Sequence, residues 1–511
     1  MSATWRIDGV DLDRLSHLAS LLALFVRPGD LLTLSGELGA GKTTLARALI
    51  DRIWGGAGEE IVSPTFALAE TYQTPRMAIT HMDCFRLESA GEVQELGLED
   101  ALDDGLVLLE WPERIASALA VDRLEITLEE TDDETERDML LEGRGAWAPR
   151  LERLRAMAEF LSGSGWRDAD ISYLQGDASA RSYARMARGT ERAVLMNSPR
   201  QPDGPAIRDG KPYSALAHLA EDVRPFVAVA EALRAAGLSV PDILADDLEA
   251  GFLVIEDLGD LVFDADMAGG QDQAEIYRAA VDVLVALRQN PPPPELPLAG
   301  AGGYVLPSYD EGALGIEVEL LLDWFWPALR GELPESSVRD EFKEIWARAF
   351  ARLSGQPEGW VLRDFHSPNL IWLPERKGLK RVGIIDFQDA LRGSLAYDLA
   401  SLLQDARQQV PAALEEALRA HYCRACEAND SNFHREDFLS AYAIQGAQRN
   451  TKILGIFARL AKRDGKPGYL AHIPRVSAYL ERNLAHPDLA GLKAWYDRYL
   501  PADARAEIGS I

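Results

Sequence analysis

The sequence predicts two domains of different class, an α/β domain with a mainly parallel sheet and then an α+β domain with two lobes. The chain has 511 residues, which is more than one hydrophobic core usually serves. Up to about residue 150, short apolar runs alternate with segments of helical spacing. Beyond that point, a strand-rich stretch precedes a longer and mostly helical one. We therefore expect a first domain at 1–150 and a second at 151–511, with a small lobe at about 151–260 and a large lobe at about 261–511.

Composition and charge exclude several classes of protein. A chain with 47% hydrophobic and 26% charged residues is typical of a folded globular protein. The 53 basic and 82 acidic residues give a net charge of −29, which argues against direct, non-specific binding of nucleic acid. The apolar runs are shorter than the roughly 18 residues of a membrane span. The first residues lack a secretory signal, and three cysteines form no disulfide framework, so we expect a cytoplasmic protein without membrane contact.

The elements of the first domain follow from its apolar pattern. Short runs of branched and aliphatic residues indicate buried strands, and the segments between them have the spacing of helices. A further helix leads to a Ser-Gly-Ser-Gly stretch at 162–165, which we read as a short flexible spacer at the domain boundary. The expected strands lie at 31–35, 79–82, 106–110 and 124–128, and the expected helices at 43–53, 92–102 and 148–161.

A phosphate-binding loop follows the first of these strands. Residues 36–43 read Gly-Glu-Leu-Gly-Ala-Gly-Lys-Thr and match the pattern G-x-x-x-x-G-K-[ST] between a strand and a helix. Backbone N–H groups and the helix N-terminus then converge on phosphate oxygens. Lys42 is expected to reach the β- and γ-phosphates of a nucleotide, and the Thr43 hydroxyl to ligate Mg²⁺. The expected nucleotide-binding residues are Gly36, Glu37, Leu38, Gly39, Ala40, Gly41, Lys42, Thr43 and Thr44.

An acidic partner for the metal should stand at the end of a neighbouring strand. Asp83 follows the run at 79–82, and Glu110 follows the run at 106–109. Spacing alone does not choose between these two carboxylates. Either can also be an ordinary polar residue at a strand end.

Four motifs of the first domain resemble the TsaE family, the small ATPases of the bacterial machinery that makes threonylcarbamoyladenosine in tRNA. The resemblance covers about residues 1–150 and implies that Thr65 lies in a switch-like segment and contributes to catalysis together with Glu110. It also implies that Asp83 helps to hold Mg²⁺ and that Glu110 and Trp111 complete the ATP site. Phe85 stands where the family usually has tyrosine. The motifs are residues 36–44, Ser-Pro-Thr-Phe at 63–66, His-Met-Asp-Cys-Phe-Arg-Leu at 81–87 and Leu-Glu-Trp-Pro-Glu-Arg at 109–114.

The resemblance also implies partners for the first domain. TsaE-like proteins dock on TsaD- and TsaB-like proteins, and ATP hydrolysis drives turnover of that assembly. The tRNA is then held by the partners, which is compatible with the strongly acidic composition of this chain.

A second phosphate-handling pattern lies in the large lobe. Residues 360–372 place Asp364 and Asn369 five positions apart between apolar flanks, and Asp386 follows the apolar run at 382–385. Phosphoryl transfer needs a carboxylate beside the attacking hydroxyl and oxygen ligands for Mg²⁺ between the phosphates. We expect Asp364 to act as the catalytic base, and Asn369 and Asp386 as the metal ligands.

The small lobe has the outline of a kinase nucleotide lobe with one departure. The segment Gly-Asp-Ala-Ser-Ala-Arg-Ser-Tyr at 176–183 can cover phosphates, and the backbone of Glu256 and Leu258 is expected to meet adenine at a hinge. Met196 stands where protein kinases carry a strand lysine. Either a neighbouring base such as Arg181 or Arg185 neutralises phosphate charge, or this lobe binds ATP differently.

These motifs, together with the segment at 448–457, resemble the aminoglycoside phosphotransferase-like kinases, and within them the AmgK group. The resemblance spans about 151–511 and includes the missing strand lysine. It implies a protein-kinase-like fold and an ATP-dependent kinase that makes the 1-phosphate of N-acetylmuramate or N-acetylglucosamine for peptidoglycan recycling. Two alternatives stay open. The kinase half can act on choline, thiamine, homoserine or an aminoglycoside, or one half can be a silent partner-binding module. The sequence does not place the residues that contact the sugar.

Overall fold

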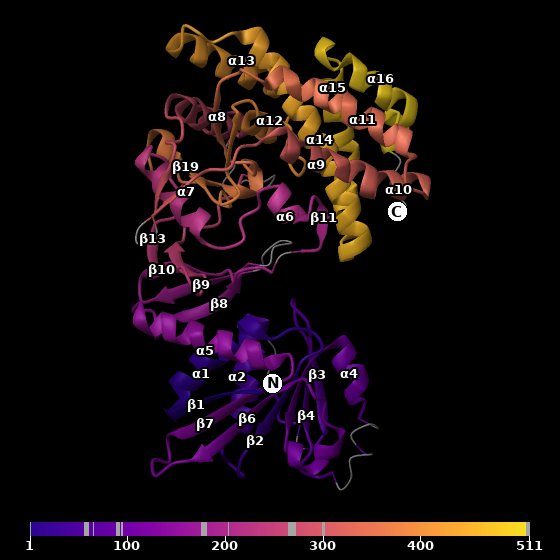
Figure 1. The fold of residues 1–511 in the computed structure, drawn as a ribbon. Coiled ribbons are helices and arrows are strands. Elements are labelled where there is room, and N and C mark those ends of the chain that lie inside the picture. Colours follow the sequence, from indigo (N-terminus) through magenta and orange to yellow (C-terminus); the bar gives the residue numbers. More distant parts are fainter. Residues whose placement is uncertain are drawn as a thin grey trace. The chain divides into compact units, whose positions relative to one another are not determined.

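The computed structural model describes residues 2–55, 61–64, 66–87, 92, 96–174, 181–202, 204–263, 272–298 and 302–506. Contacts between Cα atoms divide the chain into two compact units, which we call unit 1 and unit 2 (Figure 1). Unit 1 comprises Met1–Pro199 and Ile243–Asp257, and unit 2 comprises Arg200–Asp242 and Leu258–Ile511.

A seven-stranded sheet with the order β1-β7-β6-β2-β5-β4-β3 forms the first half of unit 1. Its four central strands pair in parallel, and the remaining pairs are antiparallel. The predicted parallel α/β sheet is therefore confirmed, and its four predicted strands correspond to β2, β4, β5 and β6. The strands are β1 (Ser2–Val10), β2 (Leu31–Ser35), β3 (Ala69–Gln73), β4 (Ala78–Asp83), β5 (Gly105–Glu110), β6 (Arg123–Glu130) and β7 (Arg137–Arg144).

Four described α-helices accompany this sheet: α1 (Leu12–Phe25), α2 (Lys42–Trp54), α4 (Leu98–Asp104) and α5 (Trp147–Gly163). The predicted helix at 43–53 is α2. The predicted helix at 148–161 is longer, because the Ser164 N–H and hydroxyl groups both donate to the Phe160 carbonyl, at 2.9 and 2.8 Å. The first half of the expected spacer is thus the last turn of α5, and the spacer prediction is corrected.

A second, five-stranded antiparallel sheet completes unit 1, with the order β13-β14-β10-β9-β8. One hydrophobic core runs from the seven-stranded sheet through α5 into this second sheet. On the side of the second sheet, the Phe160 ring stacks on Phe252 with a centroid distance of 5.6 Å, and the Arg153 guanidinium lies 3.7 Å from the centre of the Phe252 ring. The strands are β8 (Asp170–Leu174), β9 (Ser182–Arg188), β10 (Glu191–Asn197), β13 (Ile243–Asp247) and β14 (Phe252–Glu256).

Unit 2 is mostly helical, as predicted for the large lobe, and its longest described helix, α14, packs against α9, α12 and α15. Among the described residues, no helix combines the length and apolarity that crossing a membrane requires. The helices are α6 (Tyr213–Leu216), α7 (Arg224–Ala235), α8 (Gln273–Gln289), α9 (Glu311–Leu320), α10 (Trp326–Arg330), α11 (Ser336–Phe350), α12 (Tyr397–Leu403), α13 (Ala412–Asn429), α14 (Arg435–Asp464), α15 (Ile473–Leu484), α16 (Ala490–Tyr499) and α17 (Ala502–Ala506).

Short ladders interrupt the helices of unit 2 and carry the predicted phosphotransfer motifs. β17 pairs with β20, and β18 pairs with β19, all antiparallel. The loop between β17 and β18 holds the motif of Asp364, and the turn after β19 holds Asp386. The strands are β11 (Ala206–Arg208), β12 (Lys211–Pro212), β15 (Leu296–Leu298), β16 (Gly302–Tyr304), β17 (Glu358–Val361), β18 (Leu370–Trp372), β19 (Val382–Ile384) and β20 (Leu391–Ser394).

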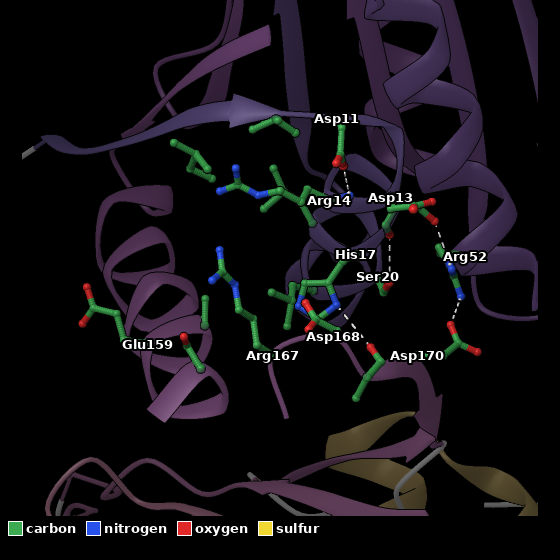
Figure 2. Close-up of a pocket in the computed structure, with 18 of the residues that line it drawn as sticks. Asp11, Asp13, Arg14, His17, Ser20, Arg52, Glu159, Arg167, Asp168 and Asp170 are labelled. Atoms are coloured by element: carbon green, nitrogen blue, oxygen red, sulfur yellow. Dashed lines mark hydrogen bonds and ion pairs between the residues drawn. The ribbon is translucent and has the colours of Figure 1, made fainter. Parts of the chain in front are cut away.

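A pocket of about 800 Å³ opens in unit 1 beside α1 (Figure 2). Residues of α1, β1 and α5 line it together with residues 167–170. His17 Nδ1 lies 3.2 Å from the Ala169 carbonyl oxygen, and Arg52 pairs with Asp170 at its rim. Because none of the predicted motif residues lines it, this pocket is separate from both phosphate-handling motifs.

Candidate active sites

The glycine-rich loop joins the end of β2 to the start of α2. Gly36, Gly39 and Gly41 all have positive φ, at 140°, 91° and 104°, which glycine adopts without strain. A Cβ atom on Gly36 would lie 2.5 Å from the Leu128 carbonyl oxygen, so the loop also needs glycine for space. The strand, loop and helix required by the sequence pattern are therefore in place.

Lys42 is folded over its own loop. Its Nζ donates to the carbonyl oxygens of Gly36 and Glu37 at 2.7 and 2.9 Å, and lies 3.7 Å from the centre of the Trp111 ring. Burial lowers the pKa of Lys42, while nearby carboxylates, Glu110 foremost, act in the opposite direction. The lysine is thus held by acceptors that phosphate oxygens can replace, and the indole of Trp111 covers it.

The two acidic candidates lie at the same edge of the sheet. β4 and β5 are parallel, and Asp83 is in register with Glu110. The Thr43 hydroxyl donates to Glu110 Oε1 at 2.8 Å, whereas Asp83 Oδ1 accepts the Phe85 N–H at 2.9 Å. Both carboxylates are buried. The structure therefore brings Thr43, Asp83 and Glu110 together, and Glu110 is the one in direct contact with Thr43.

His81 is a further member of this site that sequence reasoning did not single out. Its Nε2 donates to Glu110 Oε1 at 2.9 Å, and its Nδ1 is buried without a hydrogen-bond partner. The side chain is fully buried on β4, two residues before Asp83. Side chains alternate along a strand, so His81 and Asp83 share a face, which is the signal that could have found it.

Three apolar side chains in the motif segments of the first domain are exposed. Phe66 is 84% exposed, Leu38 78% and Phe85 40%. The Phe85 and Trp111 rings lie 4.9 Å apart, and the Arg86 guanidinium lies 4.6 Å from the centre of the Phe66 ring. Thr65, expected in a switch-like segment, lies outside the described residues.

Unit 2 gathers the three predicted phosphotransfer residues. Asn369 Nδ2 donates to the Asp364 backbone oxygen at 3.1 Å and lies 3.4 Å from Asp386 Oδ2. Gln388 Nε2 donates to Asp386 Oδ1 at 2.9 Å. Asp386 has a φ of 59°, a strained value for a non-glycine residue. One carboxylate and one amide therefore face each other beside the loop that carries Asp364.

The Asp364 carboxylate is partly exposed and anionic. His366 Nε2 lies 3.7 Å from Asp364 Oδ1. Burial alone would raise the pKa of Asp364, but the neighbouring His366, Lys452 and Arg363 hold it well below its usual range. The group is thus ionised near neutral pH.

Two buried acidic residues, which sequence reasoning missed, bind the residues just before Asp364 in this loop. They are Asp398 and Glu317. Asp398 on α12 accepts the N–H groups of Leu362 and Arg363 at 2.6 and 3.0 Å, and burial raises its pKa to about 7. Glu317 on α9 pairs with Arg363 and, at 2.8 Å, with Lys452. An acidic residue inside an apolar stretch, as at Glu317, was the available sequence signal.

The expected nucleotide-lobe features are partly described. Glu256 ends β14, and Leu258 packs against Gly383 of β19. Met196 is buried within β10, in register with Leu253 of β14. Residues 176–180 of the expected phosphate-covering segment lie outside the described residues. Arg185, one of the two suggested replacements for the strand lysine, forms an ion pair with Asp257, with Nε and Oδ2 2.6 Å apart.

Metal-binding groups in both sites are few. Among the described residues, no group of three or more His, Cys, Asp or Glu side chains forms a ready metal cage. Hydroxyl, carboxylate and amide oxygens stand instead in sets of two or three: Thr43, Asp83 and Glu110 in unit 1, and Asn369 and Asp386 in unit 2. Such sparse oxygen sets are suited to Mg²⁺, which retains waters and shares its ligands with nucleotide phosphates.

Comparisons with known proteins agree with both motifs. A family model described as threonylcarbamoyl adenosine biosynthesis protein TsaE matches residues 10–139, and one described as phosphotransferase enzyme family matches residues 170–438. The N-acetylmuramate/N-acetylglucosamine kinase of Caulobacter vibrioides is 42% identical, over 69% of this chain and 98% of its own length. The kinase of the same name from Pseudomonas aeruginosa is 36% identical, over 66% of this chain and 91% of its own.

The N-terminal part has relatives of another kind. The tRNA threonylcarbamoyladenosine biosynthesis protein TsaE of Rickettsia felis is 44% identical, over 23% of this chain and 67% of its own length. Two families that match separate, non-overlapping stretches therefore meet in one polypeptide. The chain belongs to the TsaE family through its N-terminal part and to the phosphotransferase enzyme family through its C-terminal part.

Proposed function

We propose that this chain carries two ATP-dependent activities. The N-terminal part hydrolyses ATP in support of threonylcarbamoyladenosine synthesis on tRNA, and the C-terminal part phosphorylates the anomeric hydroxyl of N-acetylmuramate and N-acetylglucosamine in peptidoglycan recycling. The observation that carries the proposal is the presence of two separate phosphate-handling sets, one around Thr43 and Glu110 and one around Asp364 and Asn369. We place the functional boundary near residue 150, and α5 contributes to the single hydrophobic core that spans it.

In the N-terminal site, Lys42 and the loop N–H groups bind the β- and γ-phosphates of ATP. Thr43, Asp83 and Glu110 hold Mg²⁺, which neutralises phosphate charge when bound. Glu110 also orients the attacking water, with His81 fixing its carboxylate at 2.9 Å. Thr65 contributes from its switch-like segment, and Trp111 lies over Lys42 beside the nucleotide.

In the C-terminal site, Asp364 accepts the proton of the sugar hydroxyl. The hydroxyl oxygen bonds to the γ-phosphorus of ATP while the bond from that phosphorus to the bridging oxygen breaks and ADP leaves. Its depressed pKa keeps it unprotonated near neutral pH. Asn369 and Asp386 would hold Mg²⁺, which would neutralise phosphate charge there. The backbone of Glu256 and Leu258 binds adenine. The high identity to amino-sugar kinases over nearly their whole length supports this substrate class above choline, thiamine, homoserine or aminoglycosides.

Exposed apolar side chains in the motif segments of the N-terminal part support a docking role. Leu38 of the loop and Phe66 and Phe85 of two other motifs are exposed to solvent, and such groups are typical of protein contact surfaces. TsaD- and TsaB-like proteins are the proposed partners. The net charge of −29 supports indirect contact with tRNA through those partners, and we propose that the protein works in the cytoplasm.

The kinase activity is tested by incubating the full chain with ATP and either sugar, and identifying the product by phosphorus NMR. A 1-phosphate is expected from the wild type and none from Asp364→Ala. A wild type that forms no sugar phosphate contradicts the kinase assignment. The ATPase role is tested in cells lacking their own TsaE, where the wild type should restore threonylcarbamoyladenosine and Lys42→Ala should not.

A further inference from the structure

A segment of α14, residues 445–452 or about two turns, brings an unusual set of buried polar side chains beside the catalytic loop of unit 2. Polar and charged residues seldom lie inside a protein without a specific partner. In this segment, Gln448 Nε2 and Lys452 Nζ donate to the two oxygens of Glu317, at 2.9 and 2.8 Å. The buried polar residues of the segment are all less than a tenth exposed: Gln445, Gln448, Arg449, Asn450, Thr451 and Lys452.

Arg449 is the charged residue of this segment that has no ion pair among the described residues. Its side chain is 6% exposed, its Nε is buried with no hydrogen-bond partner, and it forms no ion pair within the described part of the chain. Arg363 and Lys452 already share the carboxylate of Glu317. A buried guanidinium is costly unless an anion satisfies it. Asp398 acts on Arg449 through its charge but forms no ion pair with it, so Arg449 can pair with an anionic ligand.

Arg449 lies close to the loop that carries Asp364. Arg449 and Lys452 are three residues apart on one helix and therefore share a face. The charge of Lys452 acts on Asp364, and the charge of Arg449 acts on Asp398, which binds the two N–H groups just before Asp364. Both cations thus lie next to the loop that would receive the sugar.

The two sugars of the proposed function differ in a single group. N-acetylmuramate carries a lactyl ether with a carboxylate, two ring carbons from the anomeric carbon, and N-acetylglucosamine has a hydroxyl there. A guanidinium binds a carboxylate through two parallel N–H···O bonds. We propose that Arg449 binds this carboxylate and is the residue that favours N-acetylmuramate over N-acetylglucosamine. The inference rests on the proposed kinase function.

The test combines loss of the guanidinium in the enzyme with loss of the carboxylate in the substrate. kcat/KM is measured for the wild type and Arg449→Gln with N-acetylmuramate, its uncharged carboxamide and N-acetylglucosamine. Arg449→Gln should lower kcat/KM for N-acetylmuramate about 10- to 100-fold, chiefly through KM, because a charge-assisted bidentate contact is lost. N-acetylglucosamine should stay within about twofold. The wild type should prefer the acid to the carboxamide by a similar factor, and the variant should not.

Two further variants separate charge from structure. Arg449→Lys keeps the charge without the planar pair of donors and should retain part of the preference. Arg463→Gln removes an exposed arginine from the last turn of the same helix, where it pairs with Asp464. This variant should leave kcat/KM unchanged for both sugars. Unchanged N-acetylglucosamine turnover shows that a variant is folded.

Each remaining outcome is informative. An equal loss for both sugars overturns the inference, because Arg449 would then act on the transferred phosphoryl group or on the scaffold. Equal kcat/KM of the wild type for acid and carboxamide overturns it without reference to any variant. A wild type that phosphorylates neither sugar overturns the proposed function itself, and this inference with it.

Discussion

The Thr43 hydroxyl and the Glu110 carboxylate, 67 residues apart in the chain, are joined by a hydrogen bond of 2.8 Å. Thr43 opens α2 after the glycine loop, and Glu110 ends β5, so the contact closes the gap between the loop and the neighbouring parallel strand. A hydroxyl and a carboxylate at this distance can exchange their mutual contact for a shared Mg²⁺ ion.

Glu110→Gln should lower ATP hydrolysis by about 100-fold or more, because the amide keeps the shape but loses the charge that holds metal and orients water. Nucleotide binding should change much less, since Lys42 and the loop N–H groups remain. Phosphate release and nucleotide titration measure the two effects. Glu99→Gln, which changes an exposed carboxylate in the first turn of α4, is the matched control. Hydrolysis at the wild-type rate in Glu110→Gln would refute the role of this residue.

Glu317→Gln should destabilise unit 2 by about 3–5 kcal/mol at neutral pH, because Arg363 and Lys452 would both lose their buried counter-ion. Glu317 is fully buried, and although burial favours its neutral form, Lys452 and Arg363 lower its pKa to about 2. The stabilisation is therefore complete above the unfolded pKa of about 4.5 and is lost as the pH falls through about 2.

Thermal unfolding measured between pH 7 and pH 3 tests this linkage. The midpoints of the wild type and Glu317→Gln should converge as the pH falls. Glu311→Gln, at the exposed start of the same helix, should follow the wild type throughout. A constant difference between the wild type and Glu317→Gln over this pH range is incompatible with the predicted pKa shift.

A fragment starting at residue 145 should be less stable than the same region in the full chain. α5 packs on β1 and β7, and by helical periodicity Leu151 lies opposite Arg153 and Phe160, which contact the five-stranded sheet. Removing the first domain therefore uncovers an apolar face of α5. The fragment should unfold at a lower temperature and bind the dye ANS.

Leu151→Gln supplies the matched comparison. In the full chain it should cost about 3 kcal/mol, since Leu151 is buried in the shared core. In the fragment it should reduce dye binding with little loss of stability, because the same position is then in solvent. Equal destabilisation in both settings would show that α5 does not depend on the first domain.

The sequence predicted those features that local patterns determine. The glycine loop requires a strand before it and a helix after it, so β2 and α2 were placed correctly. The motifs of Asp364 and Asp386 could be predicted because each is a short pattern of neighbouring residues in the sequence. The edge strand β1 was missed, because its partner is β7, some 130 residues further along the chain.

The supporting groups were missed because their surroundings come from distant parts of the fold. Glu317 and Asp398 look like ordinary helix charges until tertiary contacts bury them beneath the catalytic loop. The Ser-Gly-Ser-Gly stretch has the composition of a linker, yet Ser164 caps α5 and ends it in an ordered turn. A composition rich in serine and glycine indicates a flexible backbone in the unfolded chain. Whether the same residues are ordered in the folded protein depends on their tertiary contacts.

The central claim is that one chain holds two independent phosphate-handling sites. It is tested by measuring both activities on the same purified protein, for the wild type and for two variants. ATP hydrolysis without sugar and sugar phosphorylation with ATP are measured for the wild type, Lys42→Ala and Asp364→Ala. Lys42→Ala should abolish hydrolysis and leave sugar phosphorylation within about twofold, and Asp364→Ala should do the reverse. If either single substitution abolishes both rates in a folded protein, the two sites are not independent and the account is contradicted.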